Sequence, residues 1–186
     1  MARDLQKCTA VDDQLPEGWT LTGTDREVFR LHDADIVTWA AIADGPDGSA
    51  MAVVASEDKS DSIWALRRRI LGDLPPTEGW ALPAPAGALF DPDHTTVFAD
   101  DENDPEVREA VREAEAALPP GWVLYETDRE KYSVGGVKVA AWAVSAVGPR
   151  GEAAMAMGIG EANAIRQLAR VLRGDLAVSN AWAPIL

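Results

Sequence analysis

The pentapeptide Leu118-Pro119-Pro120-Gly121-Trp122 repeats an earlier stretch, Leu15-Pro16-Glu17-Gly18-Trp19, in a chain of 186 residues. The two tryptophans lie 103 positions apart, and Thr-Asp-Arg-Glu follows each pentapeptide at the same distance, at residues 24–27 and 127–130. Internal repeats identify repeated structural units, and this period is far longer than that of a solenoid. The sequence therefore predicts two tandem copies of one small domain.

The match extends along most of each copy, and after the recurring Gly-Pro-x-Gly sequence the offset falls to 102. Paired positions include Phe29 with Tyr132, Trp39 with Trp142, Gly72 with Gly174 and Trp80 with Trp182. Residues 1–80 are interpreted as the first unit and residues 104–186 as the second. Residues 81–103, rich in Ala, Pro and Asp, are interpreted as an acidic linker.

Each copy is predicted to consist of strands followed by a helix. Apolar and polar residues alternate on either side of Thr-Asp-Arg-Glu, which suggests a hairpin with the tetrapeptide at or near its tip. Residues 36–43 and 137–147 are nearly continuous apolar stretches, typical of a strand covered on both faces. A returning strand and an amphipathic helix follow, and Gly72 or Gly174 ends the helix as a left-handed cap.

The second copy has an additional helix signal before its first strand. The stretch Asn103-Asp104-Pro105-Glu106 combines a capping side chain, a proline in the first turn and an acid near the positive end of the helix dipole. Whether residues 4–11 form the equivalent helix is left open. The fold class is therefore α+β, a tandem duplication of an antiparallel sheet-plus-helix unit, βββα or αβββα, with pseudo-twofold symmetry.

The stretch from Gly148 to Leu172 combines a strand, a Gly-Ile-Gly-Glu-Ala turn and an alanine-bearing helix. In this order it resembles the second half of a double-stranded RNA-binding domain. The resemblance implies an RNA-binding-like module as one alternative function. Glu161, Ala162 and Asn163 stand where that family has the lysines that hold phosphates, so the resemblance lacks its main binding feature.

The charge is strongly acidic, with a net charge of −14 and an isoelectric point near 4.4. Residues 81–118 alone carry ten acidic and two basic side chains. Affinity for nucleic acid comes largely from neutralising phosphates, so this balance argues against nucleic acid as the main ligand. It leaves an alternative function: an acidic inhibitor that imitates nucleic acid, such as a phage anti-defence protein, with residues 91–115 offering the carboxylates.

Exposed arginines and one tryptophan are the candidate partner-binding residues. Arg166, Arg170 and Arg173 are spaced to form one exposed helical stripe. These arginines are either solvated cations near the helix C-terminus or paired with the acidic linker, or they contact the acidic surface of a partner or RNA. Trp64 has no counterpart in the second copy, where Arg166 takes its place, and is expected to be the most exposed tryptophan. The tryptophans in the predicted strands are expected to pack in the cores.

Arg26 and Arg129, from the two Thr-Asp-Arg-Glu copies, are further candidates for partner binding. In the first interpretation the tetrapeptide forms a tight turn, and the side chains of Asp25 and Asp128 make hydrogen bonds to the backbone of that turn. In the second interpretation it is a polar site presented twice to a partner.

Signals for catalysis and metal binding are scarce. His32 and His94 have no counterparts in the other copy, and the acids between Asp91 and Glu102 lack the spacing of a calcium loop. We therefore expect no catalytic residue, metal or cofactor. A small enzyme would require a deep pocket holding His32 or paired acids.

No apolar run approaches the roughly 20 residues that a membrane span needs, and the single Cys8 cannot form an internal disulfide. The sequence thus favours a cytoplasmic, non-catalytic accessory or regulatory factor with a protein partner. The oligomeric state is left open.

Overall fold

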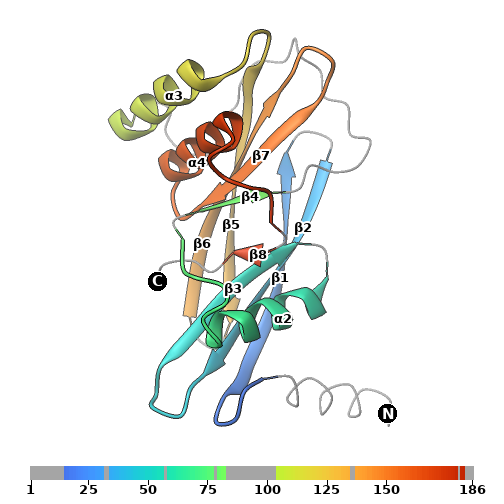
Figure 1. Ribbon diagram of the computed structural model, residues 1–186, viewed down its shortest axis with the longest axis vertical. Coiled ribbons are helices and arrows are strands. Elements are labelled where there is room, and N and C mark those ends of the chain that lie inside the picture. The colour runs from blue at the N-terminus through green and yellow to red at the C-terminus, as the bar shows by residue number, and fades with distance from the viewer. Residues whose placement is uncertain are drawn as a thin grey trace.

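The protein has an α+β fold, described here from a computed structural model that covers residues 15–31, 34–56, 58–77, 79–82, 104–134, 137–179 and 181–182. Within these residues it contains two antiparallel four-stranded sheets and three helices (Figure 1). The strands are β1 (Thr20–Leu31), β2 (Ala34–Asp44), β3 (Ala50–Ser56), β4 (Gly79–Leu82), β5 (Val123–Val134), β6 (Val137–Val147), β7 (Ala153–Gly158) and β8 (Ala181–Trp182). The helices are α2 (Lys59–Ile70), α3 (Pro105–Ala117) and α4 (Glu161–Arg173).

The two sheets have the strand orders β1-β2-β3-β8 and β4-β7-β6-β5. In both sheets a long hairpin, β1–β2 or β5–β6, is extended by a third strand in the same antiparallel order. The pairings Asp25 with Ala40 and Asp128 with Ala143 are 103 residues apart, as are the other pairs of the two hairpins. The register shift that follows Leu21 also recurs after Leu124. Corresponding residues therefore hold corresponding places in the two hairpins.

The fourth strand of each sheet comes from the other half of the chain. β4 follows α2 but pairs with β7, while β8 follows α4 but pairs with β3. The indole N–H of Trp80 donates to the carbonyl of Ser179, and that of Trp182 donates to the carbonyl of Thr77. Each half thus completes the sheet of the other half.

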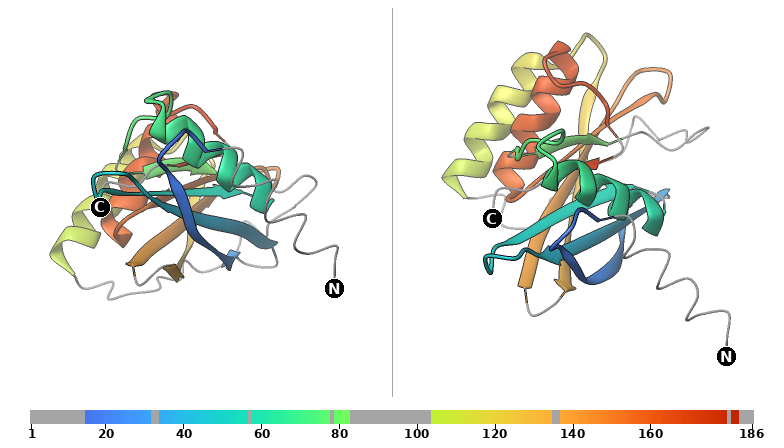
Figure 2. Two further views of the ribbon diagram at one scale, coloured as in Figure 1. Left: turned by 90° about the horizontal axis from the view of Figure 1, so that it is seen from below. Right: turned by 60° about the horizontal axis from the view of Figure 1, so that its bottom comes forward.

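A central apolar core joins the two halves, and helices cover the remaining sheet faces (Figure 2). Phe29, Tyr132, Trp80 and Trp182 are all buried in the central core. α2 packs on β2 and β3, whereas α3 and α4 lie side by side over the sheet of β5, β6 and β7. β2 and β6 each contribute residues to the central core and to a helix-covered core. Each strand is therefore buried on both faces, which explains why its sequence is almost continuously apolar.

The helix boundaries confirm the predicted start and stop signals. Asp104 caps α3, accepting a hydrogen bond from the backbone N–H of Glu106 at 2.8 Å, and Pro105 opens the helix. α3 gives the second half the predicted order αβββα. Gly72 and Gly174 have φ angles of 83° and 79°, the left-handed backbone predicted where α2 and α4 end.

The prediction that Thr-Asp-Arg-Glu lies at a hairpin tip is wrong. Residues 24–27 lie within β1 and residues 127–130 within β5, paired throughout with β2 and β6. Ladder hydrogen bonds use the backbone alone, so a run of polar side chains does not interrupt a strand that has a paired neighbour. The polar residues are explained by a contact with a different strand, described next.

Candidate protein-binding surfaces

β1 and β5 lie against each other where the two halves meet, and the aspartates of Thr-Asp-Arg-Glu join them. Asp25 Oδ2 accepts a hydrogen bond from the backbone N–H of Ser133, and Asp128 Oδ2 accepts one from the backbone N–H of Arg30, both at 2.7 Å. The other oxygen of each aspartate accepts from the next backbone N–H of its own strand. The aspartates therefore bind backbone donors of an opposing strand, not those of a tight turn.

The glutamates of the same tetrapeptides lie close to this contact. Burial, followed by the charge of Asp25, raises the pKa of Glu27 above its usual value, with Arg26 acting in the opposite direction. Burial also raises the pKa of Glu130, with further contributions from the carboxylates of Asp128 and Glu27. The β1–β5 contact thus brings together carboxylates from both halves.

Arg26 and Arg129 hold corresponding places, each opposite a tryptophan in the strand register: Arg26 with Trp39, and Arg129 with Trp142. Both arginines are exposed, and the Arg129 guanidinium lies 4.7 Å from the centre of the Trp142 ring. This distance is typical of a cation–π contact. The structure therefore places the exposed Arg129 against the ring of a tryptophan that is only 9% exposed, and a partner-binding role for either arginine stays a prediction.

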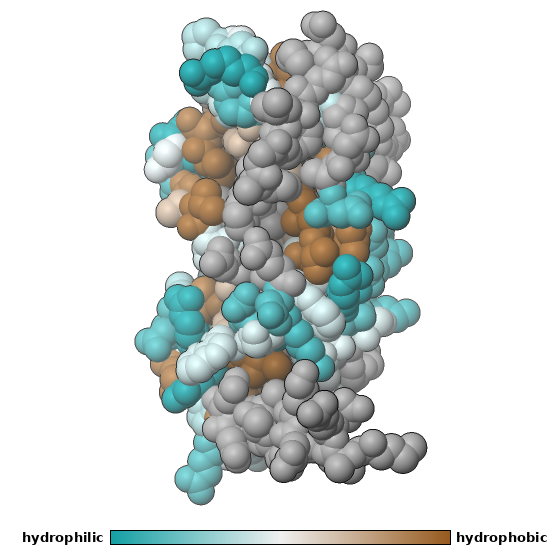
Figure 3. All heavy atoms as spheres, turned by 90° about the vertical axis from the view of Figure 1, so that its right-hand side faces the viewer, coloured by the Kyte–Doolittle hydropathy of each residue, from teal (hydrophilic) through white to brown (hydrophobic). Residues whose placement is uncertain are grey.

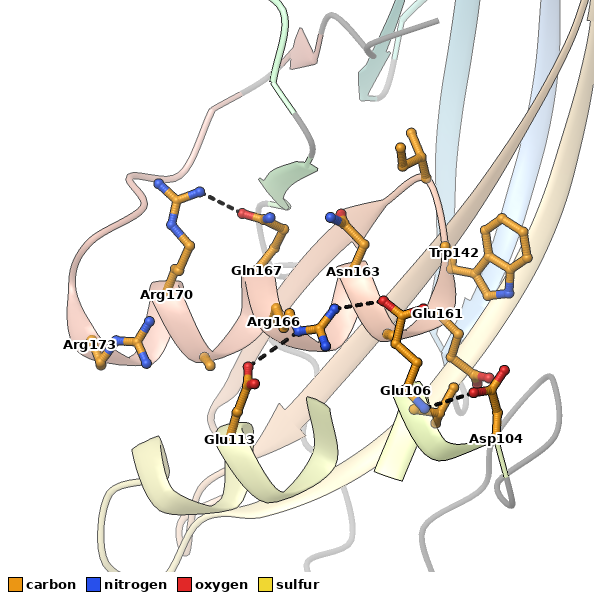
Figure 4. A pocket seen from close by; sticks show the side chains of 15 residues that line it. Asp104, Glu106, Glu113, Trp142, Glu161, Asn163, Arg166, Gln167, Arg170 and Arg173 are labelled. Carbon is orange, nitrogen blue, oxygen red and sulfur yellow. Dashed lines mark hydrogen bonds and ion pairs between the residues drawn. The ribbon is translucent and has the colours of Figure 1, made fainter. Parts of the chain in front are cut away.

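The three α4 arginines line a groove of about 750 Å³, and of these Arg166 points toward α3 (Figure 4). Arg166 donates to Glu106 at 2.9 Å and to Glu113 at 3.3 Å, so it joins the two helices. Arg170 donates to Gln167 and Arg173 to Asp175. Instead of forming one free stripe, the three arginines are divided among separate partners, and Arg166 pairs with α3 rather than with the predicted linker.

Sequence analysis did not identify the role of Glu161 at the start of α4. Its side chain is only 4% exposed, lines the groove and accepts a hydrogen bond from the hydroxyl of Thr127. A carboxylate at a helix N-terminus is favoured by the helix dipole. In the RNA-binding family that the sequence resembles, a lysine at this position holds a phosphate. Glu161 is buried, so its side chain is not exposed for such a contact. Glu161 follows a Gly-x-Gly turn, which was the only available sequence signal.

The exposed face of α2 differs from the corresponding face of α4. Trp64 is 50% exposed, as predicted, and Leu71, seven residues later, is 54% exposed. The Arg67 guanidinium lies 5.4 Å from the centre of the Trp64 ring. We refer to Trp64, Arg67 and Leu71 as the α2 face.

Other exposed large hydrophobic residues lie outside the α2 face. They are Val123, Ile159 and Val178. On the side of the molecule shown in Figure 3, hydrophobic residues form separate areas rather than one continuous band. The α2 face is therefore unusual in combining two exposed apolar side chains with a stacked arginine on one helix.

In the part of the chain that the structure describes, no group of three or more His, Cys, Asp or Glu residues is arranged to hold a metal ion. No helix of the same residues is long and apolar enough to cross a membrane. His32, His94 and the acids from Asp91 to Glu102 lie outside the described residues, as does most of the predicted linker.

No protein-family description, curated protein or solved structure that we compared with the chain matches it.

Proposed function

We propose that the protein is a non-catalytic, protein-binding accessory or regulatory factor, built from two tandem copies of one unit related by a pseudo-twofold axis. The recurring strand register and the reciprocal aspartate contacts support the duplication. The cytoplasmic location expected from the single Cys8 is part of the same proposal.

The observation that carries the binding proposal is the α2 face. Trp64 and Leu71 expose large apolar side chains on one side of a single helix, and Arg67 stacks on the tryptophan. Tryptophan and arginine are enriched among the residues that contribute most to protein–protein binding. A protein gains nothing in its own stability from leaving these side chains in water, whereas a partner that covers them removes apolar area from water.

The alternatives receive less support from the same structure. Among the acidic residues proposed to imitate nucleic acid, Glu106 and Glu113 are engaged by Arg166, and Glu109 pairs with Arg112. The RNA-binding alternative needs cations at the start of α4, where the chain has the buried Glu161. We therefore place the functional surface on α2.

Affinity capture with a matched pair of variants tests this proposal. The wild-type chain, the Trp64→Ala/Leu71→Ala double variant and a Val178→Ala control, which alters a different exposed apolar residue, are used to capture partners from lysate of the native host. Proteins and nucleic acids in each eluate are quantified. We expect a protein recovered by the wild type and the control but reduced at least tenfold by the double variant. Equal recovery by all three chains would exclude the α2 face, and recovery of RNA alone would replace a protein partner with a nucleic acid.

A further inference from the structure

The α2 face corresponds to a surface of α4 that is already covered by a helix. The helix caps Asp58 and Gly160 lie 102 residues apart, and the same offset relates Trp64 to Arg166, Arg67 to Ala169 and Leu71 to Arg173. On α4, Ala169 is only 2% exposed and belongs to the core that includes Val107, Ala110 and Ala114 of α3. Arg166 pairs with two α3 glutamates. The helix–helix contact of the second half therefore uses the positions that correspond to Trp64 and Arg67 of the α2 face.

We propose that the α2 face binds an acidic amphipathic helix of a partner protein, placed beside α2 as α3 is placed beside α4. This inference rests on the proposed protein-binding function and specifies the partner's chemistry. Amphipathic helices commonly bind by laying an apolar face against a complementary surface. α3 shows what such a helix requires here: small or branched apolar residues facing α4, with glutamates beside them that reach a cation.

Charge complementarity favours an acidic helix. α2 carries one lysine and three arginines against the single acid Asp61, and Arg67, Arg68 and Arg69 are in its last turn. α3 carries four glutamates against two arginines. Although Trp64 replaces Arg166, the stacked Arg67 brings a guanidinium to the tryptophan ring. A glutamate of a bound helix would therefore still find a cation near this position, while the Trp64 ring and Leu71 supply more apolar area than α4 offers.

The chain's own N-terminal residues match this role poorly in sequence. At the offset of 103 that relates the two copies, Cys8 and Val11 stand in place of Val111 and Ala114, but Asp4 and Lys7 stand in place of Val107 and Ala110, which are both buried in the α3–α4 contact. Charged side chains rarely occupy fully buried positions. This difference favours a helix from another protein as the occupant of the α2 face.

The probe for this inference is a fluorescent peptide with the sequence of residues 104–118, which is an acidic amphipathic helix known to fit the corresponding surface. Isolated helices of this length are marginally stable. We therefore staple the peptide between positions 108 and 112, which are both exposed in α3. Fluorescence anisotropy measures its binding to the full chain. We expect saturable binding that weakens at least tenfold for the Trp64→Ala/Leu71→Ala variant.

Two controls identify the surface and the chemistry. Arg166→Ala alters the α4 surface, and we expect it to leave the affinity of the peptide within about twofold, because the peptide binds α2. A peptide with glutamines at positions 106, 109, 113 and 115 should bind at least fivefold more weakly at low salt, because it lacks the carboxylates that face the α2 arginines. Equal affinity of the acidic and neutral peptides would overturn the acidic specificity.

Other occupants give different results. No peptide binding up to millimolar concentration would overturn the inference, as would binding lost with Arg166→Ala but not with the α2 variant. Binding seen only after removal of residues 1–14 would assign the α2 face to the chain's own N-terminus. Self-association abolished by the α2 variant would assign it to a second copy. A fluorescent duplex RNA that binds in place of the peptide, and is lost in the α2 variant, would assign the face to phosphate.

The lysate experiment separates this inference from the proposed function. A captured protein that depends on Trp64 and Leu71, but whose binding region is neither helical nor acidic, would leave the proposed function intact and overturn only the inference about the partner's chemistry. If the α2 variant loses neither protein nor peptide, both proposals fail together.

Discussion

The carboxylate of Asp25 reaches across the junction of the two halves to the backbone of Ser133, with Oδ2 and N 2.7 Å apart. The same contact is made in the opposite direction by Asp128 and Arg30. β1 and β5 are both edge strands of their sheets. Edge strands expose unpaired backbone donors that can template aggregation, and each of these cross-strand contacts satisfies one such donor.

Removing both aspartates should weaken the association of the two halves. Hydrogen bonds to charged groups contribute about 1.5–3 kcal/mol when well shielded, and less at the surface. Because both contacts are exposed, we expect Asp25→Ala/Asp128→Ala to lower the free energy of unfolding by about 2 kcal/mol in total, measured by urea denaturation. Asp73→Ala removes an exposed carboxylate near the end of α2 and should change it by less than about 0.5 kcal/mol. Equal effects of the two changes would show that the β1–β5 contact contributes no stability.

Glu27 and Glu130 should make the protein less stable at neutral pH than it would be with neutral residues at these positions. Their pKa values are raised in the folded protein, so the cost of ionisation is present above the folded pKa and disappears as the pH falls below the unfolded value of 4.5. Glu27→Gln/Glu130→Gln should therefore stabilise the chain at pH 7 by up to about 0.5 kcal/mol, because the side chains are partly exposed.

The pH dependence provides the decisive comparison for these glutamates. Thermal unfolding from pH 3.5 to 8 should show the gain at neutral pH and its loss below about pH 4.5. Glu17→Gln changes an exposed carboxylate before β1 and serves as the control for a simple change of net charge. A gain of constant size at every pH would contradict the proposed ionisation effect.

The sequence predicted most elements of the fold but not how the halves meet. Its repeats identified corresponding strands, and capping signals located the start of α3 and the ends of α2 and α4, because these features depend on local backbone chemistry. Thr-Asp-Arg-Glu was misassigned because its aspartates bind strands 108 and 98 positions away in the chain, and no local pattern specifies such a partner. The exchange of β4 and β8 was missed for the same reason, although the Trp80 and Trp182 pair marked both strands.

The sequence predicted some features of the candidate surfaces and not others. Trp64 was correctly expected to be exposed, since its counterpart is the charged Arg166. The engagement of Arg166 by α3 was not foreseen, because helical spacing shows which side chains share a face but not what covers that face. The sequence analysis made no prediction for Leu71, which is the C-cap residue that follows α2 and is 54% exposed.

Trp182 should be essential to the exchanged arrangement. It is 1% exposed, packs in the central core shared by both halves, and donates its indole N–H to the carbonyl of Thr77 at 2.8 Å. Truncating a buried tryptophan to alanine costs about 3–5 kcal/mol. We expect Trp182→Ala to lower the free energy of unfolding by this amount in urea denaturation.

Two variants separate the contributions of Trp182. Trp182→Phe keeps most of the apolar volume but loses the hydrogen bond, so it should cost less than Trp182→Ala. Trp64→Ala removes the same side chain from an exposed position and should change the stability by less than about 0.5 kcal/mol. A loss below 1 kcal/mol for Trp182→Ala would mean that β8 does not hold the two halves together.

Arg166 should contribute to the packing of α3 on α4 through electrostatics. Its guanidinium pairs with Glu106 and Glu113 from one helix, and a network of this kind contributes more than an isolated surface pair. We expect Arg166→Ala to cost about 1 kcal/mol at low salt, with a smaller cost in 1 M NaCl, where the screening length falls to about 3 Å. Arg112→Ala is the matched control, because Arg112 pairs with Glu109 inside α3 and joins no second helix. Its cost should stay below about 0.5 kcal/mol, since it is an exposed pair three residues apart. If both substitutions lower the free energy of unfolding by the same amount at both salt concentrations, the ion pairs of Arg166 add no stability to the contact. In that case the apolar residues Val107, Ala110 and Ala114 hold α3 on α4.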